Sequence, residues 1–143
     1  MESITSFKVV MLGILGAVGA FFSSLFGGWD SALTTLVIFM AVDYGTGLLV
    51  AGVFKKSESG ALESRAGWKG LCRKGMTLLI VLIAARLDMA MGSNFIKDAV
   101  VIGYIANETL SIVENAGLMG LPIPTVISKA IDALQNDSES KGV

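Results

Sequence analysis

Long apolar segments dominate this chain, and they limit it to folds in which whole helices meet lipid or one another. The first runs from Val9 to Phe26, eighteen residues without a charged side chain. A helix needs about 20 predominantly apolar residues to cross the hydrocarbon core of a bilayer. Hydrophobic residues make up 53% of the 143 residues, and the mean hydropathy is +0.71. The sequence therefore predicts a small, all-α integral membrane protein.

Four hydrophobic helices are expected, all of them spanning the membrane, at about residues 8–27, 31–54, 70–91 and 95–117. With their connections they form a predicted membrane domain, residues 1–124. The first segment also has features of a signal peptide, but Glu2 beside Lys8 is untypical of the basic start of such a peptide. Small residues permit close helix packing in the first two segments, namely Gly13, Ala17, Ala20, Gly45 and Gly47.

A basic segment separates the second and third helices. Between Lys55 and Lys74 lie six of the eleven basic residues, opposed only by Glu58 and Glu63. Short basic loops stay in the cytoplasm, so residues 55–74 are predicted to form a cytoplasmic loop, with both chain termini on the same side. The second half of this segment either forms a short interfacial helix that begins at an N-cap, Ser64, or remains a loop whose charges are solvated by water. Its basic side chains are Arg65, Lys69, Arg73 and Lys74.

Charged residues also lie within or beside the apolar segments. Asp43 is near the middle of the second helix, well inside the bilayer at a rise of 1.5 Å per residue. A third helix from about Gly70 to about Met91 would place Arg86 and Asp88 near the outer boundary. Intramembrane charges pair with one another, and Arg86 is a candidate partner for Asp43. For Asp43 we favour static hydrogen bonding within a compact bundle over a place in a water-filled lumen.

The fourth segment sorts its polar side chains to one side. At 100° per residue, an arc of about 140° collects Gly103, Tyr104, Asn107, Glu108, Ser111, Glu114 and Asn115, here called the polar arc. A charge at the bilayer centre costs about 2.5–3.5 kcal/mol, so lipid is a poor environment for its two glutamates. The arc must meet water, another helix or its own copy in a neighbouring subunit. The segment either spans the bilayer, as we expect, or lies flat at its surface.

The C-terminal region begins where the fourth helix stops. Gly117 and Gly120 can end that helix, and Pro122 and Pro124 prevent its continuation. Residues 125–143 are predicted to form a short amphipathic helix followed by a disordered polar tail.

Composition argues against several classes of function. The chain has no histidine and one cysteine, Cys72, so an internal disulfide is excluded and no metal site is predicted. The carboxylates have no nucleophile, metal-ligand set or nucleotide loop beside them, so we expect no enzymatic activity, no catalytic residues and no cofactor. A net charge of −1 gives no reason to expect a nucleic-acid partner.

Four stretches have the order and spacing of one known family. They are DYGTGLLVA (43–51), SRAGWKGLCRK (64–74), ARLD (85–88) and YIANETLSIVENAGLMGLPIP (104–124), of which the last is the most specific. Through them the chain resembles the phage holin family that also includes clostridial toxin-secretion holins. The resemblance implies a multi-pass protein of the bacterial cytoplasmic membrane. Such proteins accumulate, oligomerise into lesions and release an endolysin or a toxin. For this chain we expect the released protein to pass through the lesion without binding specifically to it.

The resemblance and the residue pattern agree on a mechanism. Five side chains of the polar arc are predicted to face the lumen of a homo-oligomer or a neighbouring subunit: Asn107, Glu108, Ser111, Glu114 and Asn115. The alternative is static hydrogen bonding inside one bundle. Two rival functions remain, a small homo-oligomeric ion channel or transporter and an antiholin-type lysis regulator. For the second, Met11 could serve as an internal start.

Overall fold

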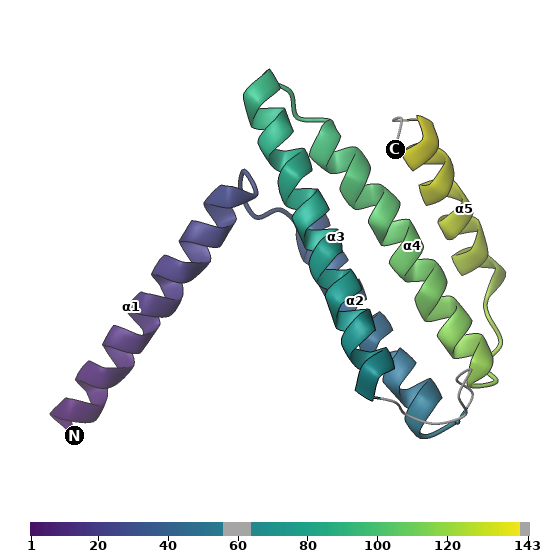
Figure 1. Ribbon diagram of the computed structural model, residues 1–143, viewed down its shortest axis with the longest axis horizontal. Coiled ribbons are helices and arrows are strands. Elements are labelled where there is room, and N and C mark those ends of the chain that lie inside the picture. Colours follow the sequence, from purple (N-terminus) through teal and green to yellow (C-terminus); the bar gives the residue numbers. More distant parts are fainter. Residues whose placement is uncertain (56–63, 141–143) are drawn as a thin grey trace.

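The computed structural model describes residues 1–55 and 64–140, and every regular element in this part of the chain is an α-helix. Figure 1 shows their arrangement: the first helix points away, and the four that follow run in alternating directions. The helices are α1 (Glu2–Leu25), α2 (Ser31–Gly52), α3 (Ser64–Met91), α4 (Ile96–Leu118) and α5 (Thr125–Ser140). The all-helical fold class is therefore as predicted.

Three of the helix ends have a local cause in the sequence. Gly27 and Gly28 adopt positive φ angles of 71° and 106° after α1, and Gly92 does the same, at 67°, after α3. Glycine adopts this region without the steric cost that a Cβ atom would bring. The carboxylate of Asp30 caps α2 by accepting a hydrogen bond of 2.8 Å from the backbone N–H of Leu33.

The core lies among α2, α3 and α4. Leu33, Leu36 and Met40 project from α2 at helical spacing and are buried. Their partners include Val81 of α3 and, from α4, Val101 and Ile105. Because α2 packs mainly against α4, the polar arc of α4 is brought to the face of α2 that carries Asp43.

Helix α1 stands apart from this core. Figure 1 shows it leaning away from the other helices and approaching them only near its C-terminal end. A span of 23 residues, Ser3–Leu25, is long and apolar enough to cross a membrane, as is Ser31–Gly52. Within the described residues only these two helices qualify by length and composition. The predicted packing residue Gly13 has no neighbour that a Cβ would meet within 4 Å, so its role stays a prediction.

Helix α5 folds back along α4. Figure 1 places the C-terminal end of α5 beside the first half of α4. Ile131 is buried and Leu134 packs against the core, whereas Lys129 and Asp132 on its polar side are exposed. The amphipathic helix was predicted, but its position along α4 was not.

Several boundaries differ from those predicted. Helix α1 begins at Glu2, about six residues before the expected start at residue 8. Helix α3 begins at Ser64, so the second half of the expected basic loop is helical and continuous with the third apolar segment. Helix α5 continues to Ser140, where a disordered tail was expected. Residues 56–63 of the predicted loop lie outside the described residues.

Candidate functional site

A cluster of charged side chains joins the middle of α2, α3 and α4. The Nζ atom of Lys74 lies 2.7 Å from Asp43 Oδ2 and 2.5 Å from Glu108 Oε2. The three side chains are only 13%, 19% and 12% exposed. A cation between two carboxylates that are this well buried is held by electrostatic attraction, which bulk water screens little. We call Asp43, Thr46, Lys74, Glu108 and Asn115 the Lys74 cluster.

Asn115 extends the cluster by hydrogen bonds from its neutral amide group. Its Nδ2 atom donates to Asp43 Oδ1 at 3.1 Å and to Thr46 Oγ1 at 2.9 Å. Asp43 therefore accepts from both α3 and α4, and its position in an apolar helix is accounted for by these partners. No buried side-chain nitrogen or oxygen atom in the described residues lacks a hydrogen-bond partner.

Glycines allow the helices to approach at this level. A Cβ atom at Gly47 would lie 3.9 Å from Nδ2 of Asn115, at the contact between α2 and α4. On α3, Cβ atoms at Gly67 and Gly70 would meet the ring or hydroxyl of Tyr44 at 3.5–3.7 Å. Gly45, which was predicted to pack in the same way, is exposed and has no such neighbour within 4 Å. Packing against described residues thus involves Gly47 and not Gly45.

The polar arc is divided between two environments. Glu108 and Asn115 point into the bundle and belong to the Lys74 cluster. Asn107 and Glu114, on the other edge of the arc, are exposed. Neither Asn107 nor Glu114 makes a side-chain hydrogen bond or ion pair to another described residue.

A polar cavity marks the division between these two halves. Its volume is about 290 Å³, and Tyr104, Asn107 and Ser111 line it together with Arg73 and the charged residues of the Lys74 cluster. Such a cavity is large enough for several water molecules and offers them polar partners. The arc is therefore satisfied on one edge and open to solvent or a partner on the other.

The expected ion pair between Asp43 and Arg86 is wrong. Asp43 is bound by Lys74, and Arg86 donates from Nη1 to the sulfur of Met89 at 3.3 Å. Lys74 in turn does not belong with the exposed basic residues Arg65, Lys69 and Arg73, with which it was grouped. A sequence signal for this existed, because Lys74 shares helical spacing with the buried side chains of α3, namely Thr77, Val81, Ala84, Ala85 and Asp88.

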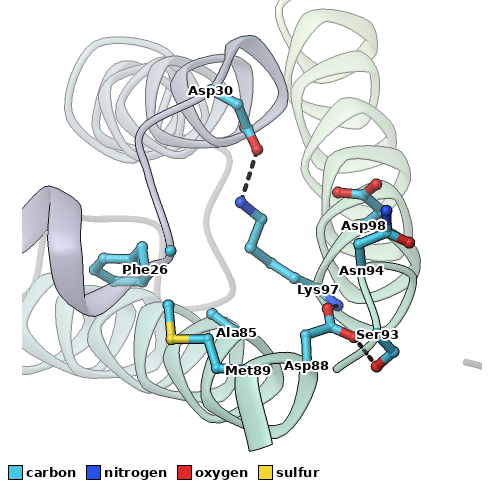
Figure 2. A pocket seen from close by; sticks show the side chains of 10 residues that line it. Phe26, Asp30, Ala85, Asp88, Met89, Ser93, Asn94, Lys97 and Asp98 are labelled. Carbon is cyan, nitrogen blue, oxygen red and sulfur yellow. Dashed lines mark hydrogen bonds and ion pairs between the residues drawn. The ribbon is translucent and has the colours of Figure 1, made fainter. Parts of the chain in front are cut away.

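A second polar cluster lies at the turn between α3 and α4, and Figure 2 shows it around a cavity of about 320 Å³. We call Asp30, Asp88, Ser93 and Lys97 the turn cluster. Asp88 is buried and accepts hydrogen bonds from Ser93 Oγ at 2.6 Å, from the N–H of Ile96 at 3.1 Å and from the N–H of Lys97 at 2.8 Å. It thereby satisfies the first free N–H groups of α4. The cap of α4 therefore comes from α3 and not from the turn itself.

Lys97 joins this turn to the start of α2. Its Nζ atom lies 2.7 Å from Asp30 Oδ2, as Figure 2 shows. Partial burial raises the pKa of Asp30, but the hydrogen bonds from Lys97 and Leu33 and the charge of Lys97 outweigh it, so the pKa lies below the usual 3.8. The turn cluster therefore connects the ends of three helices without placing a charge in the middle of any.

Both clusters hold helices together, and neither has the form of a reaction centre. No group of three or more His, Cys, Asp or Glu side chains in the described residues could hold a metal ion. Cys72 is exposed. What the geometry offers is a sorted polar helix face on which Glu108 is neutralised by Lys74 of the same chain and Glu114 is exposed.

Comparison with known proteins identifies the family. A sequence profile of the bacteriophage holin family matches residues 20–136. The chain belongs to this family. A probable holin of Bacillus phage phi105 is 36% identical over 110 residues, covering 76% of this chain and 78% of the phage protein. The holin family is not a family of enzymes, and together with the apolar helices it indicates a membrane protein.

Similar proteins also occur in bacterial genomes. An uncharacterized protein of Listeria innocua is 40% identical over 137 residues, covering 93% of this chain and 94% of the relative. An uncharacterized 14.9 kDa protein from the nagH 3′ region of Clostridium perfringens is 36% identical, covering 95% and 98%. No solved structure matches the chain significantly.

Proposed function

We propose that this holin-family protein accumulates in the bacterial cytoplasmic membrane and oligomerises into lesions that release an endolysin or a toxin. The observation that carries the proposal is the division of the polar arc. One edge is neutralised inside the chain by Lys74 and Asp43, and the other presents Asn107 and Glu114 without a partner among the described residues. Lipid accepts neither an amide nor a carboxylate readily, so this edge favours contact with water or a second copy.

The same division supports a two-state mechanism. A holin must be harmless as a monomer and permeable as a large assembly. In the harmless state the Lys74 cluster keeps the charges of α2, α3 and α4 paired within one chain. In the lesion the polar arc turns toward a water-filled lumen, where high dielectric lowers the cost of separating these charges. Lys74 thus acts as a latch on the inert state.

For topology we propose that α1, α2, α3 and α4 all span the membrane, with both termini in the cytoplasm. Helices α3 and α4 carry more charge than α1 and α2, but their central charges are paired with each other and with Asp43. Paired charges facing a bundle interior are the form in which membrane helices tolerate them. The rival arrangement, with α4 flat at the surface, would place its polar arc in the headgroup layer.

This topology requires α5 to leave α4. The polar side of α5, with Lys129 and Asp132, would otherwise lie at the level of the lipid tails. The non-helical segment 120–124, with its two prolines, provides a joint about which α5 can swing to the cytoplasmic surface. A cysteine at Ser140, in a Cys72→Ser background, would then be labelled only from the cytoplasm. Labelling from outside would contradict this half of the topology.

Lysis timing tests the proposal directly. The full chain is expressed from an inducible promoter in a bacterium that also makes a cytoplasmic endolysin, and optical density and membrane potential are followed. The parent should collapse the potential and then lyse the culture abruptly. Replacing Glu108 and Glu114 by Gln should leave membrane abundance near normal and shift or abolish lysis, while Ile112→Val, a conservative change on the apolar side of α4, should lyse on time.

The two rival functions give different results in the same experiment. A small ion channel or transporter would depolarise the cells without releasing the endolysin. An antiholin-type regulator would not lyse cells by itself and would delay lysis by a co-expressed holin. Either pattern in the parent chain would overturn the proposed function.

A further inference from the structure

The beginning of α3 extends past the part of the helix that a bilayer core can hold. With 28 residues at a rise of 1.5 Å, α3 is about 42 Å long. The hydrocarbon core is about 30 Å thick, and the bilayer with its headgroups is about 40–45 Å thick. If Met91 marks the outer end, the first two turns after Ser64 therefore lie among the headgroups of the cytoplasmic leaflet. This step rests on the spanning position proposed for α3.

Three cations follow one another along one side of the first three turns of α3, with Arg73 in the third turn, at the boundary between headgroups and tails. Arg65, Lys69 and Arg73 are spaced four residues apart, so they fall within a narrow arc of the helix. All three are exposed, and none makes a side-chain hydrogen bond or ion pair to another described residue. This distinguishes them from Lys74 and Lys97, whose ammonium groups are bound by carboxylates.

The apolar side chains beside these cations also suit a position at the boundary between headgroups and tails. Trp68 is 67% exposed and Leu71 is 49% exposed, and neither belongs to the core. Tryptophan is enriched at the boundary between headgroups and tails, because its ring is apolar and its N–H is polar. The exposed face of this segment is therefore cationic on one side and apolar on the next, as the edge of a lipid leaflet requires.

We propose that Arg65, Lys69 and Arg73 form a binding face for the phosphate groups of anionic phospholipids in the cytoplasmic leaflet, such as phosphatidylglycerol. A guanidinium group binds phosphate through two parallel hydrogen bonds, and an ammonium group adds a point charge. An anionic leaflet also attracts juxtamembrane cations through its surface potential. Each lipid bound here anchors α3 at a fixed depth, and with it the position of Lys74.

Fluorescence of Trp68 provides the test. Trp29→Phe leaves Trp68 as the single tryptophan of the full chain. The protein is reconstituted into vesicles of equal parts phosphatidylglycerol and phosphatidylcholine, with brominated acyl chains on one lipid or the other. The ratio of quenching by the two brominated lipids reports which lipid contacts Trp68. We expect a preference for phosphatidylglycerol of about twofold or more at low salt, and a ratio near one at about 1 M salt, where the screening length falls to about 3 Å.

Two triple variants separate a defined face from general charge attraction. Replacing Arg65, Lys69 and Arg73 by Gln should bring the ratio to about one at low salt as well. Replacing Lys8, Lys55 and Lys129 by Gln removes the same charge from exposed residues elsewhere and should leave the preference unchanged. A ratio of one in the parent, or an equal loss in both variants, would overturn the lipid-binding face.

The outcome is separable from that of the proposed function. A chain that shows the lipid preference but does not lyse cells would overturn the holin role alone. A chain that lyses cells but shows no preference would overturn the lipid-binding face alone.

Discussion

The two polar clusters of this bundle use similar side chains for different purposes. In the turn cluster, Asp88 and Asp30 mainly satisfy backbone N–H groups at helix starts, and Lys97 joins them at a boundary where Asp30 remains 42% exposed. In the Lys74 cluster, the charges lie in mid-helix and mainly satisfy one another. Charges at helix ends therefore fix where helices begin, whereas charges in mid-helix fix how helices are rotated and shifted relative to each other.

The largest loss of stability should follow removal of the ammonium group of Lys74, the cation at the centre of the Lys74 cluster. Lys74→Gln leaves Asp43 and Glu108 close together without a countercharge, and breaking a buried ion pair in this way costs about 3–5 kcal/mol. Thermal unfolding of the detergent-solubilised chain should show this loss, while Lys69→Gln, five residues earlier and exposed, should unfold like the parent. Adding Asp43→Asn and Glu108→Gln should restore most of the stability, since a neutral network leaves no unpaired charge. Lack of any recovery would mean that Lys74 acts through packing and not through charge.

A smaller effect is expected in the turn cluster. Asp88→Ala removes the acceptor for the N–H groups of Ile96 and Lys97, so the start of α4 should fray and the melting temperature should fall by a few degrees. Asp98→Ala is the matched control, because Asp98 is an exposed acid in the same first turn. Faster hydrogen exchange confined to the first turn of α4 would support the capping role. Equal effects of the two variants would contradict it.

The smallest effect should come from pH at Asp30. Its pKa is lower in the folded chain than the usual 3.8, so its contribution to stability is complete above that value and is lost as the pH falls through the folded pKa. Melting temperature should therefore show an Asp30-dependent fall only below about pH 4. The difference between parent and Asp30→Asn should be constant from pH 7 to 5 and shrink at lower pH. A difference that changes mainly between pH 5 and 7 would point to another group.

Sequence reasoning was most successful where one physical requirement acts along a single helix. Apolar length predicted four helices and amphipathic spacing predicted the helix after Pro124, while the basic interfacial helix expected on its own is the first part of α3. The angular sorting of polar residues predicted the polar arc. It failed where the answer depends on how two helices face each other. Asp43 needed a partner, and that part was right, but the general tendency of intramembrane charges to pair suggested Arg86. The partner is Lys74, whose place on the buried face of α3 is visible only when its spacing from Thr77 and Val81 is considered.

Three further features could not be predicted from the pattern of any one helix, because each depends on another helix or on the conformation of a connecting segment. The cap of α4 comes from Asp88, on the preceding helix, so no pattern within α4 itself indicates it. The return of α5 along α4 depends on the conformation of the segment around Gly120, whose φ angle of 86° sets the direction of the chain. The division of the polar arc follows from the contact of α2 with α4, and periodicity cannot specify which edge that contact covers.

The most direct test of the latch is lysis onset in two single variants at matched membrane abundance. Lys74→Gln should lyse earlier than the parent, because the inert pairing of α2, α3 and α4 is lost. Glu114→Gln, on the exposed edge of the polar arc, should lyse later or not at all, because the surface offered to water or a second copy is weakened. Onset unchanged in both variants, or a delay in Lys74→Gln with an advance in Glu114→Gln, would contradict the assignment of the two edges.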